Sequence, residues 1–180
     1  MDGTVAAAPP AADAGGADLY ERDFVAWTER EAARLRDAAS RDSNLPVDWL
    51  NVAEEIEALG KSDARELESR LATIAEHLLK LAHSPARDPR AGWEETVGRE
   101  RGRVARLLRQ SPSLRPRVAD LLADAVRDGA ADAVRALKRY GETEAAAACA
   151  GDAGATLTED RLLGDWFPDA PPTDAAAPRR

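Results

Sequence analysis

Residues 62–85 read SDARELESRLATIAEHLLKLAHSP, and the spacing of the apolar side chains in this stretch decides the fold class. Five of them recur at alternating intervals of four and three residues: Leu67, Leu71, Ile74, Leu78 and Leu81. This spacing places them on one face of an α-helix. Ser62 can cap the start of the helix, and Pro85 ends it. The stretch therefore predicts an amphipathic helix that packs against other helices.

Two further helices are predicted on the N-terminal side of this stretch. The first begins at Asp18, where Glu21 completes a capping box. The second begins at Asp48 and ends at Gly60, because glycine readily adopts the left-handed conformation that follows many helices. Their apolar faces consist of Tyr20, Phe24, Trp27 and Leu35 in the first and of Trp49, Val52, Ile56 and Leu59 in the second.

Two more helices are predicted on the C-terminal side, over residues 89–110 and 113–137, the second continuing past Gly129. Gly98 and Gly102 interrupt the first of them, and each costs about 1 kcal/mol relative to alanine. Either another backbone approaches this helix closely at the two glycines, or the helix is locally weak.

No window of the sequence alternates with period two over the length of a strand, so we predict no sheet. The expected fold is all-α, an up-and-down bundle of about five helices joined by short links. Gly141 to Ala155 is rich in alanine but broken by glycine, and we expect it to be disordered. The expected domain organisation is a disordered tail over 1–17, the bundle over 18–140, an extension over 141–168 with a short helix or turn at 158–164 that docks on the bundle, and a disordered tail over 169–180.

Composition narrows the function classes. The net charge of −8, from 33 acidic and 25 basic residues, disfavours binding to nucleic acid or to anionic lipid. Cys149 is the single cysteine, so neither an intramolecular disulfide nor a thiolate metal cage can form, which fits a cytoplasmic protein. No run of about 18 apolar residues is present, and membrane insertion is therefore not expected.

Two charged residues fall on apolar helix faces. Arg101 lies in the middle of the face formed by Trp93, Val97, Val104 and Leu108, and Glu31 lies between Trp27 and Leu35. We predict that Glu31 and Arg101 form a buried or half-buried pair. The pair either fixes the register of two helices, or leaves the arginine as an anion-binding group in a cleft.

His77 lies at the edge of the apolar face of its helix, on the same flank as Glu66 and Arg70. It is either a half-buried side chain satisfied by a carboxylate or a catalytic acid or base. A diiron site in a helical bundle needs glutamate three residues before histidine, whereas Ile74 and Lys80 precede His77 and His83. We predict no metal and no cofactor.

The string EEIE at 54–57 is the most acidic part of the chain's helical pattern. Glu54 points directly away from the apolar face, Glu57 points mostly away, and Glu55 lies at the border, so the three carboxylates do not converge on one metal ion. They form either a solvated surface or a docking face for a basic partner, with Glu54 and Glu57 as the candidate interaction residues. No phosphate loop, nucleophile elbow or zinc-binding histidine pair is present.

An ordered series of motifs between residues 20 and 168 resembles a bacterial family known as domain of unknown function number twenty-nine. The motifs are YERDF (20–24) with Trp27, DW (48–49), EEIE (54–57), LG (59–60), REL (65–67), HLLK (77–80), Trp93 with Thr96 and Arg101, SPSL (111–114) and WFP (166–168). The resemblance implies an all-helical domain without an established activity and offers no catalytic residues to carry over. Glu31 stands where glutamine is usual, which leaves open whether its pairing with Arg101 is general.

Three functional hypotheses follow. The first is a non-enzymatic interaction protein that binds a protein partner through the face of Glu54 and Glu57. The second is an enzyme or small-ligand binder with a pocket between helices, in which Arg101 anchors an anion and His77 acts as acid or base. The third is nucleic-acid binding through the arginines near 99–109, and the net charge makes it the weakest. The candidate polar cluster for the second hypothesis is Glu31, Glu55, Arg70, His77 and Arg101.

Overall fold

The computed structural model describes residues 14–41, 45–152 and 157–171, and these residues form helices without any strand. The elements are α1 (Ala14–Arg22), α2 (Phe24–Ser40), α3 (Trp49–His83), α4 (Arg90–Gln110), the 3-10 turn η1 (Pro112–Leu114), α5 (Arg117–Arg139), α6 (Thr143–Asp152) and α7 (Glu159–Leu163). The predicted all-α bundle is confirmed.

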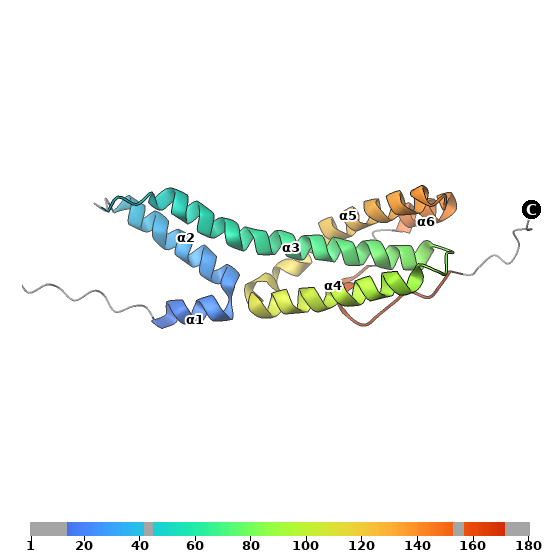
Figure 1. Ribbon diagram of the computed structural model, residues 1–180, viewed down its shortest axis with the longest axis horizontal. Helices are drawn as coiled ribbons and strands as arrows, with labels where there is room; N and C mark the ends of the chain where they lie inside the picture. The colour runs from blue at the N-terminus through green and yellow to red at the C-terminus, as the bar shows by residue number, and fades with distance from the viewer. Residues whose placement is uncertain (1–13, 42–44, 153–156, 172–180) are drawn as a thin grey trace, which may run out of the picture.

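Helix α3 is the central element of the bundle. Its predicted apolar face is fully buried, with Leu67, Leu71, Ile74, Leu78 and Leu81 in the core. α2, α4 and α5 all pack against it, and successive helices run in alternating directions (Figure 1). α4 and α5 lie along the C-terminal half of α3, and α6 packs beside α5. The core therefore surrounds the stretch that decides the fold class.

The predicted helix end at Gly60 is wrong, because α3 continues through this residue without interruption for 35 residues. Gly60 is buried against α2, where a Cβ atom would overlap the hydroxyl oxygen of Thr28. That hydroxyl donates a hydrogen bond to the carbonyl oxygen of Val25, 2.7 Å away, and is held in place. Glycine is present here because two helices cross closely, not because a helix ends.

The predicted N-terminal cap is also wrong. α1 begins at Ala14 rather than Asp18, so the tail expected over 1–17 overlaps the helix; residues 1–13 lie outside the described part of the chain. The chain turns at Asp23, whose carboxylate accepts the backbone N–H of Ala26 at 3.0 Å and caps α2. The same carboxylate accepts the backbone N–H and the hydroxyl of Ser113, both at 2.7 Å. Asp23 therefore fixes the start of α2 against η1.

The disorder expected over residues 141–155 is wrong for most of that range, since α6 spans Thr143–Asp152; residues 153–155 are not described. Ala146 and Cys149 are buried against the rest of the bundle. Alanine packs through its methyl group alone, so a weakly amphipathic helix can be buried on one side. α7 forms within the predicted range 158–164, and most of the tail expected over 169–180, from residue 172 on, falls outside the described residues.

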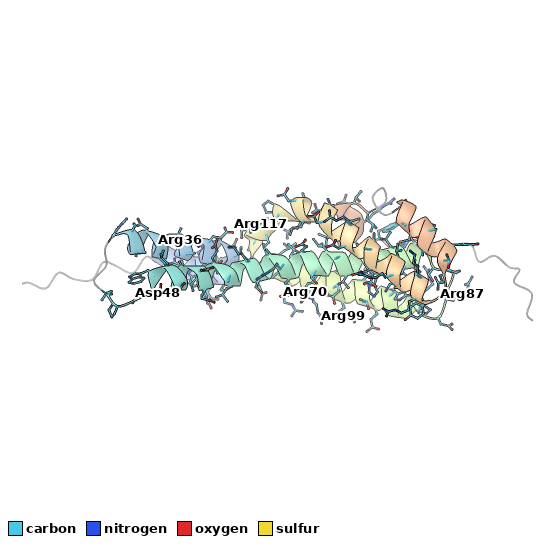
Figure 2. All side chains as sticks on the ribbon, turned by 90° about the horizontal axis from the view of Figure 1, so that it is seen from above. Arg36, Asp48, Arg70, Arg87, Arg99 and Arg117 are labelled. Atoms are coloured by element: carbon cyan, nitrogen blue, oxygen red, sulfur yellow. The ribbon has the colours of Figure 1, made fainter. Side chains whose placement is uncertain are left out.

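One part of the molecule extends beyond the bundle. α2 and the beginning of α3 lie side by side past the ends of α4 and α5, and Arg36 and Asp48 mark this part in the second view (Figures 1 and 2). We call the described residues 24–41 and 45–60 the arm. Arg36 of α2 donates a hydrogen bond to Glu57 of α3 at 2.7 Å, which together with the crossing at Gly60 joins the two helices of the arm.

Candidate functional site

Arg101 holds the C-terminal segment rather than a carboxylate. Its guanidinium donates hydrogen bonds to the carbonyl oxygens of Leu162, Arg161 and Trp166, at 2.7, 2.7 and 2.8 Å. Its carbon lies 4.9 Å from the centre of the Phe167 ring, within the range of a cation–π contact. Two of the three carbonyls are the unsatisfied groups at the end of α7. Arg101 therefore docks the segment 157–168 on α4.

The predicted pair between Glu31 and Arg101 is wrong. Glu31 lies on α2 and pairs within that helix, with Arg34 at 3.1 Å and Arg30 at 3.5 Å. Arg101 is half-buried beneath the C-terminal segment, and the groups that it meets there are backbone carbonyls. Every residue type carries such carbonyls, so the sequence contained no sign of this contact.

Among the described residues, the buried carboxylate is that of Glu100, which is 5% exposed. It accepts hydrogen bonds from Arg70 of α3 at 2.7 Å and from Arg103 at 2.8 Å, and Arg99 approaches it at 3.4 Å. Burial alone would raise the pKa of Glu100, but the hydrogen bond from Arg70 and the charge of Arg103 outweigh burial and lower that pKa below its usual value. Figure 2 shows Arg70 and Arg99 along the same edge of the molecule.

The burial of Glu100 was not predicted, although the apolar spacing around this residue indicates it. Trp93, Val97, Glu100, Val104 and Leu107 follow one another at intervals of four, three, four and three residues. Glu100 thus occupies an apolar position of α4. Its three arginine partners satisfy its oxygens, and Arg70 also binds Glu66 of its own helix at 2.6 Å. This is an ion network that joins α3 to α4, without a free acid or base.

His77 belongs to a separate network at the α3–α4 contact. Its Nδ1 lies 2.9 Å from the carbonyl oxygen of Thr73, and this carbonyl requires Nδ1 to carry the proton. Its Nε2 then accepts from the ammonium of Lys80 at 3.3 Å, and that ammonium also binds Glu76 at 2.8 Å. Burial lowers the pKa of His77, and the charge of Lys80 lowers it further. His77 is neutral at pH 7, and its accepting nitrogen is already engaged.

The candidate polar cluster is therefore distributed over the molecule. Arg70 and Arg101 bind different groups, His77 binds residues of its own helix, and Glu55 is exposed on the arm. Within the described ranges, no three histidine, cysteine, aspartate or glutamate side chains are placed to hold a metal ion. The helices described also include none with the length and apolar character needed to cross a membrane.

Cys149 should react slowly with thiol reagents in the folded protein. Its side chain is fully buried, and burial, with a smaller effect of Asp152, raises the pKa of the thiol to about 11. At pH 8 the thiolate is then roughly 100-fold scarcer than for an ordinary cysteine, and the thiolate is the reacting form. Labelling with a chromogenic disulfide should be slow in buffer and fast in denaturant. Equal rates in the two conditions would contradict this prediction.

The arm carries the most apolar exposed surface in the described part of the chain. Five of the eight large apolar side chains that are exposed there fall between residues 45 and 59: Leu45, Val47, Leu50, Val52 and Leu59. The predicted apolar face of this segment comprised Trp49, Val52, Ile56 and Leu59. The contact with α2 is instead centred on Ala53 and Gly60, which leaves Val52 and Leu59 on the uncovered flank.

The acidic residues of the arm are not equivalent. Glu57 pairs with Arg36 and, at 3.2 Å, with Lys61, so it stabilises the arm from within. The hydrogen bonds from Arg36 and Lys61 lower the pKa of Glu57, and burial opposes this lowering only weakly. Glu54 and Glu55 are exposed and form no ion pair with any other residue described. The acidic groups available to a partner are thus Glu54 and Glu55 rather than the expected Glu54 and Glu57.

Comparisons with known proteins agree with this architecture. Residues 19–162 match the family model described as Domain of unknown function DUF29. A solved alpha-helical protein of unknown function from Rhodospirillum rubrum is similar in fold, with a TM-score of 0.64 and 27% sequence identity over 81% of this chain and 89% of that one. A comparison with curated proteins finds no match.

Proposed function

We propose that this chain, which belongs to the DUF29 family, is a non-enzymatic interaction protein of the bacterial cytoplasm that binds a protein partner through its arm. The observation that carries the proposal is the concentration of exposed apolar side chains between residues 45 and 59. Exposed apolar side chains that gather in one patch mark interaction surfaces, whereas scattered ones are ordinary.

The construction of the arm supports this role. Its two helices are joined by the close crossing of Gly60 and Thr28 and by the bond between Arg36 and Glu57. A surface that is already ordered loses little conformational entropy when it binds. The unpaired carboxylates of Glu54 and Glu55 border the exposed apolar residues and favour a partner with positive charge.

The alternative of an enzyme or ligand pocket built on Arg101, His77 and Glu55 has less support. Nε and Nη2 of Arg101 are engaged by three carbonyls, and both nitrogens of His77 have partners. Glu55 is exposed on the arm. A general base must reach its substrate proton directly or through one water molecule. Because of these contacts, Arg101, His77 and Glu55 are not arranged to act together on one substrate.

The arm variant Val52→Ser/Leu59→Ser should lose partner binding and keep its stability. The two side chains are 40% and 49% exposed, so we expect the free energy of unfolding to fall by no more than about 1 kcal/mol per site. A photo-crosslinking amino acid at position 50, which is 62% exposed, should capture a partner in growing cells in the parent chain and not in the variant.

Tyr140→Ser is the matched control, since Tyr140 is exposed and lies outside the arm. It should leave capture unchanged. Capture that survives the double serine substitution, or an arm that crosslinks to no protein at all, would refute the proposed function.

A further inference from the structure

We propose that a groove at the end of the bundle opposite the arm binds a linear polyamine, a chain of methylene groups with an ammonium at each end. The groove lies where α3 ends and α6 begins, and these two helices are in contact (Figure 1). It has a volume of about 730 Å³, which is within the size range of small-molecule sites. This site is separate from the arm and does not depend on the proposed function.

Glu142 lines the groove with a carboxylate that the fold leaves unsatisfied. Its Oε2 atom is buried and accepts no hydrogen bond, and the carboxylate forms no ion pair with any other described residue. The backbone holds Glu142 in place, since its N–H donates to the carbonyl oxygen of Leu137 at 3.0 Å and its own carbonyl accepts the N–H of Ala146 at 2.9 Å. A buried carboxylate oxygen without a donor is costly, so a ligand that brings an N–H donor is favoured here.

His83 lines the same groove and also has an unsatisfied polar atom. Its side chain is only 14% exposed, and its buried Nε2 forms no hydrogen bond within the described chain. The nearest carboxylate oxygen is Oδ2 of Asp152, 3.5 Å away at the last residue of α6. A neutral imidazole nitrogen and a carboxylate are both acceptors, so one ammonium beside them can donate to both.

Apolar walls separate these two polar ends. Glu142 directly precedes α6 and Asp152 is its last residue, so the two are about 15 Å apart along the helix axis. The walls between them are formed by small apolar side chains: Ala82, Pro85, Ala145, Ala148 and Pro171. An extended chain of methylene groups fits this lining, whereas a single metal ion cannot reach both ends. The described residues also include no group of three metal-ligating side chains.

The groove carries charge of one sign. Glu142 and Glu144 line it, and no lysine or arginine of the described chain does. Both α3 and α5 end beside it, and the C-terminal end of a helix carries a partial negative charge. These two helix ends outnumber the one positive end, at the start of α6. The groove therefore attracts a cation and repels an anion.

Isothermal titration calorimetry of the full chain with spermidine tests the inference. At physiological ionic strength the parent chain should bind one spermidine with a Kd below roughly 1 mM. Butylamine has a single ammonium and leaves one polar end without a donor, so it should bind about tenfold more weakly or worse. Mg²⁺ at equal concentration should not displace spermidine, because it cannot span the groove.

Glu142→Gln removes the charge at one end of the groove while keeping the shape of the side chain. It should weaken spermidine binding about tenfold, because a hydrogen bond to a charged group is lost. The melting temperature without ligand should not fall, since the buried carboxylate has no partner to lose. Glu159→Gln is the matched control, an exposed glutamate of α7 outside the groove, and it should leave binding within about twofold of the parent.

A steric variant tests the apolar walls. Ala147 and Ala148 are both exposed on α6, but of the two only Ala148 lines the groove. Alanine and leucine are both good helix formers, so leucine at either position should leave the fold intact. Ala148→Leu should abolish spermidine binding, and Ala147→Leu should not change it.

The absence of binding up to roughly 1 mM spermidine would overturn the inference. So would equal binding of butylamine, displacement by Mg²⁺, or binding that survives Glu142→Gln and Ala148→Leu, since each would mean that spermidine is attracted only by the net charge of −8. Crosslinking through the arm should be the same in all these variants, so the failure of one proposal leaves the other standing.

Discussion

Replacing Gly129 with alanine should lower the free energy of unfolding by about 2 kcal/mol, even though alanine is the better helix former. Gly129 is the point where α5 crosses α3. A Cβ atom there would lie 2.8 Å from the Cβ of Ala75, 2.9 Å from the backbone nitrogen of Glu76 and closer still to the carbonyl oxygen of Ala72. Backbone atoms cannot rotate away as a long side chain can, so α5 would have to separate from α3.

Denaturant titration followed by circular dichroism measures this effect, and the melting temperature should fall by roughly 4 to 8 °C. Gly98→Ala is the matched control, the same substitution in a helix interior with nothing within 4 Å, and it should raise the free energy of unfolding by about 1 kcal/mol. Shifts of the same sign at the two positions would show that the crossing of α5 and α3 is not as close as described.

Replacing Arg101 with methionine should release the segment 157–168 from α4 and remove about 3 kcal/mol of the stability of its docking. Methionine keeps much of the side-chain volume but donates nothing, so three carbonyl oxygens lose their charged donor. Leu162, which is fully buried, then depends on apolar contact alone to stay in place. Binding through the arm should be unaltered.

Limited proteolysis with trypsin and hydrogen exchange of the backbone amides over 157–168 both report the release. Cleavage after Arg161 should become faster, and exchange in this segment should accelerate while exchange in α3 stays the same. Arg106→Met is the control, because Arg106 is exposed on the same helix without a partner in the described chain. If cleavage after Arg161 is as slow in Arg101→Met as in the parent, Arg101 is not what docks the segment.

The helices and their buried faces were predicted correctly wherever the spacing of apolar residues matches their burial. The intervals of Leu67 to Leu81 predicted the buried face of α3, and the same reasoning predicted α4 and the passage of α5 through Gly129. The helix end predicted at Gly60 was wrong because a glycine at a helix end and a glycine at a helix crossing look the same in the sequence. Only the neighbour tells them apart, and that neighbour, Thr28, is more than thirty residues away.

For the polar residues, too, the sequence indicated some positions but not their partners. Arg101 is half-buried, but its partners could not be predicted, since they are carbonyl oxygens 60 to 65 residues further along the chain. Glu100 was missed although the pattern around it was regular. The open space beside Gly98 and Gly102 could not be predicted, because it depends on which helices pack elsewhere.

The helical character of this chain, the course of most of its helices and the leucines of its core follow from apolar periodicity, because periodicity is a local property and every amphipathic helix in water buries its apolar face. Three features emerge only from the packing of the helices: α3 is one continuous helix, Arg101 holds the C-terminal segment, and Val52 and Leu59 stay uncovered on the arm. These features depend on distances between residues far apart in the chain, and such distances are set only when the helices pack and one face of each becomes buried.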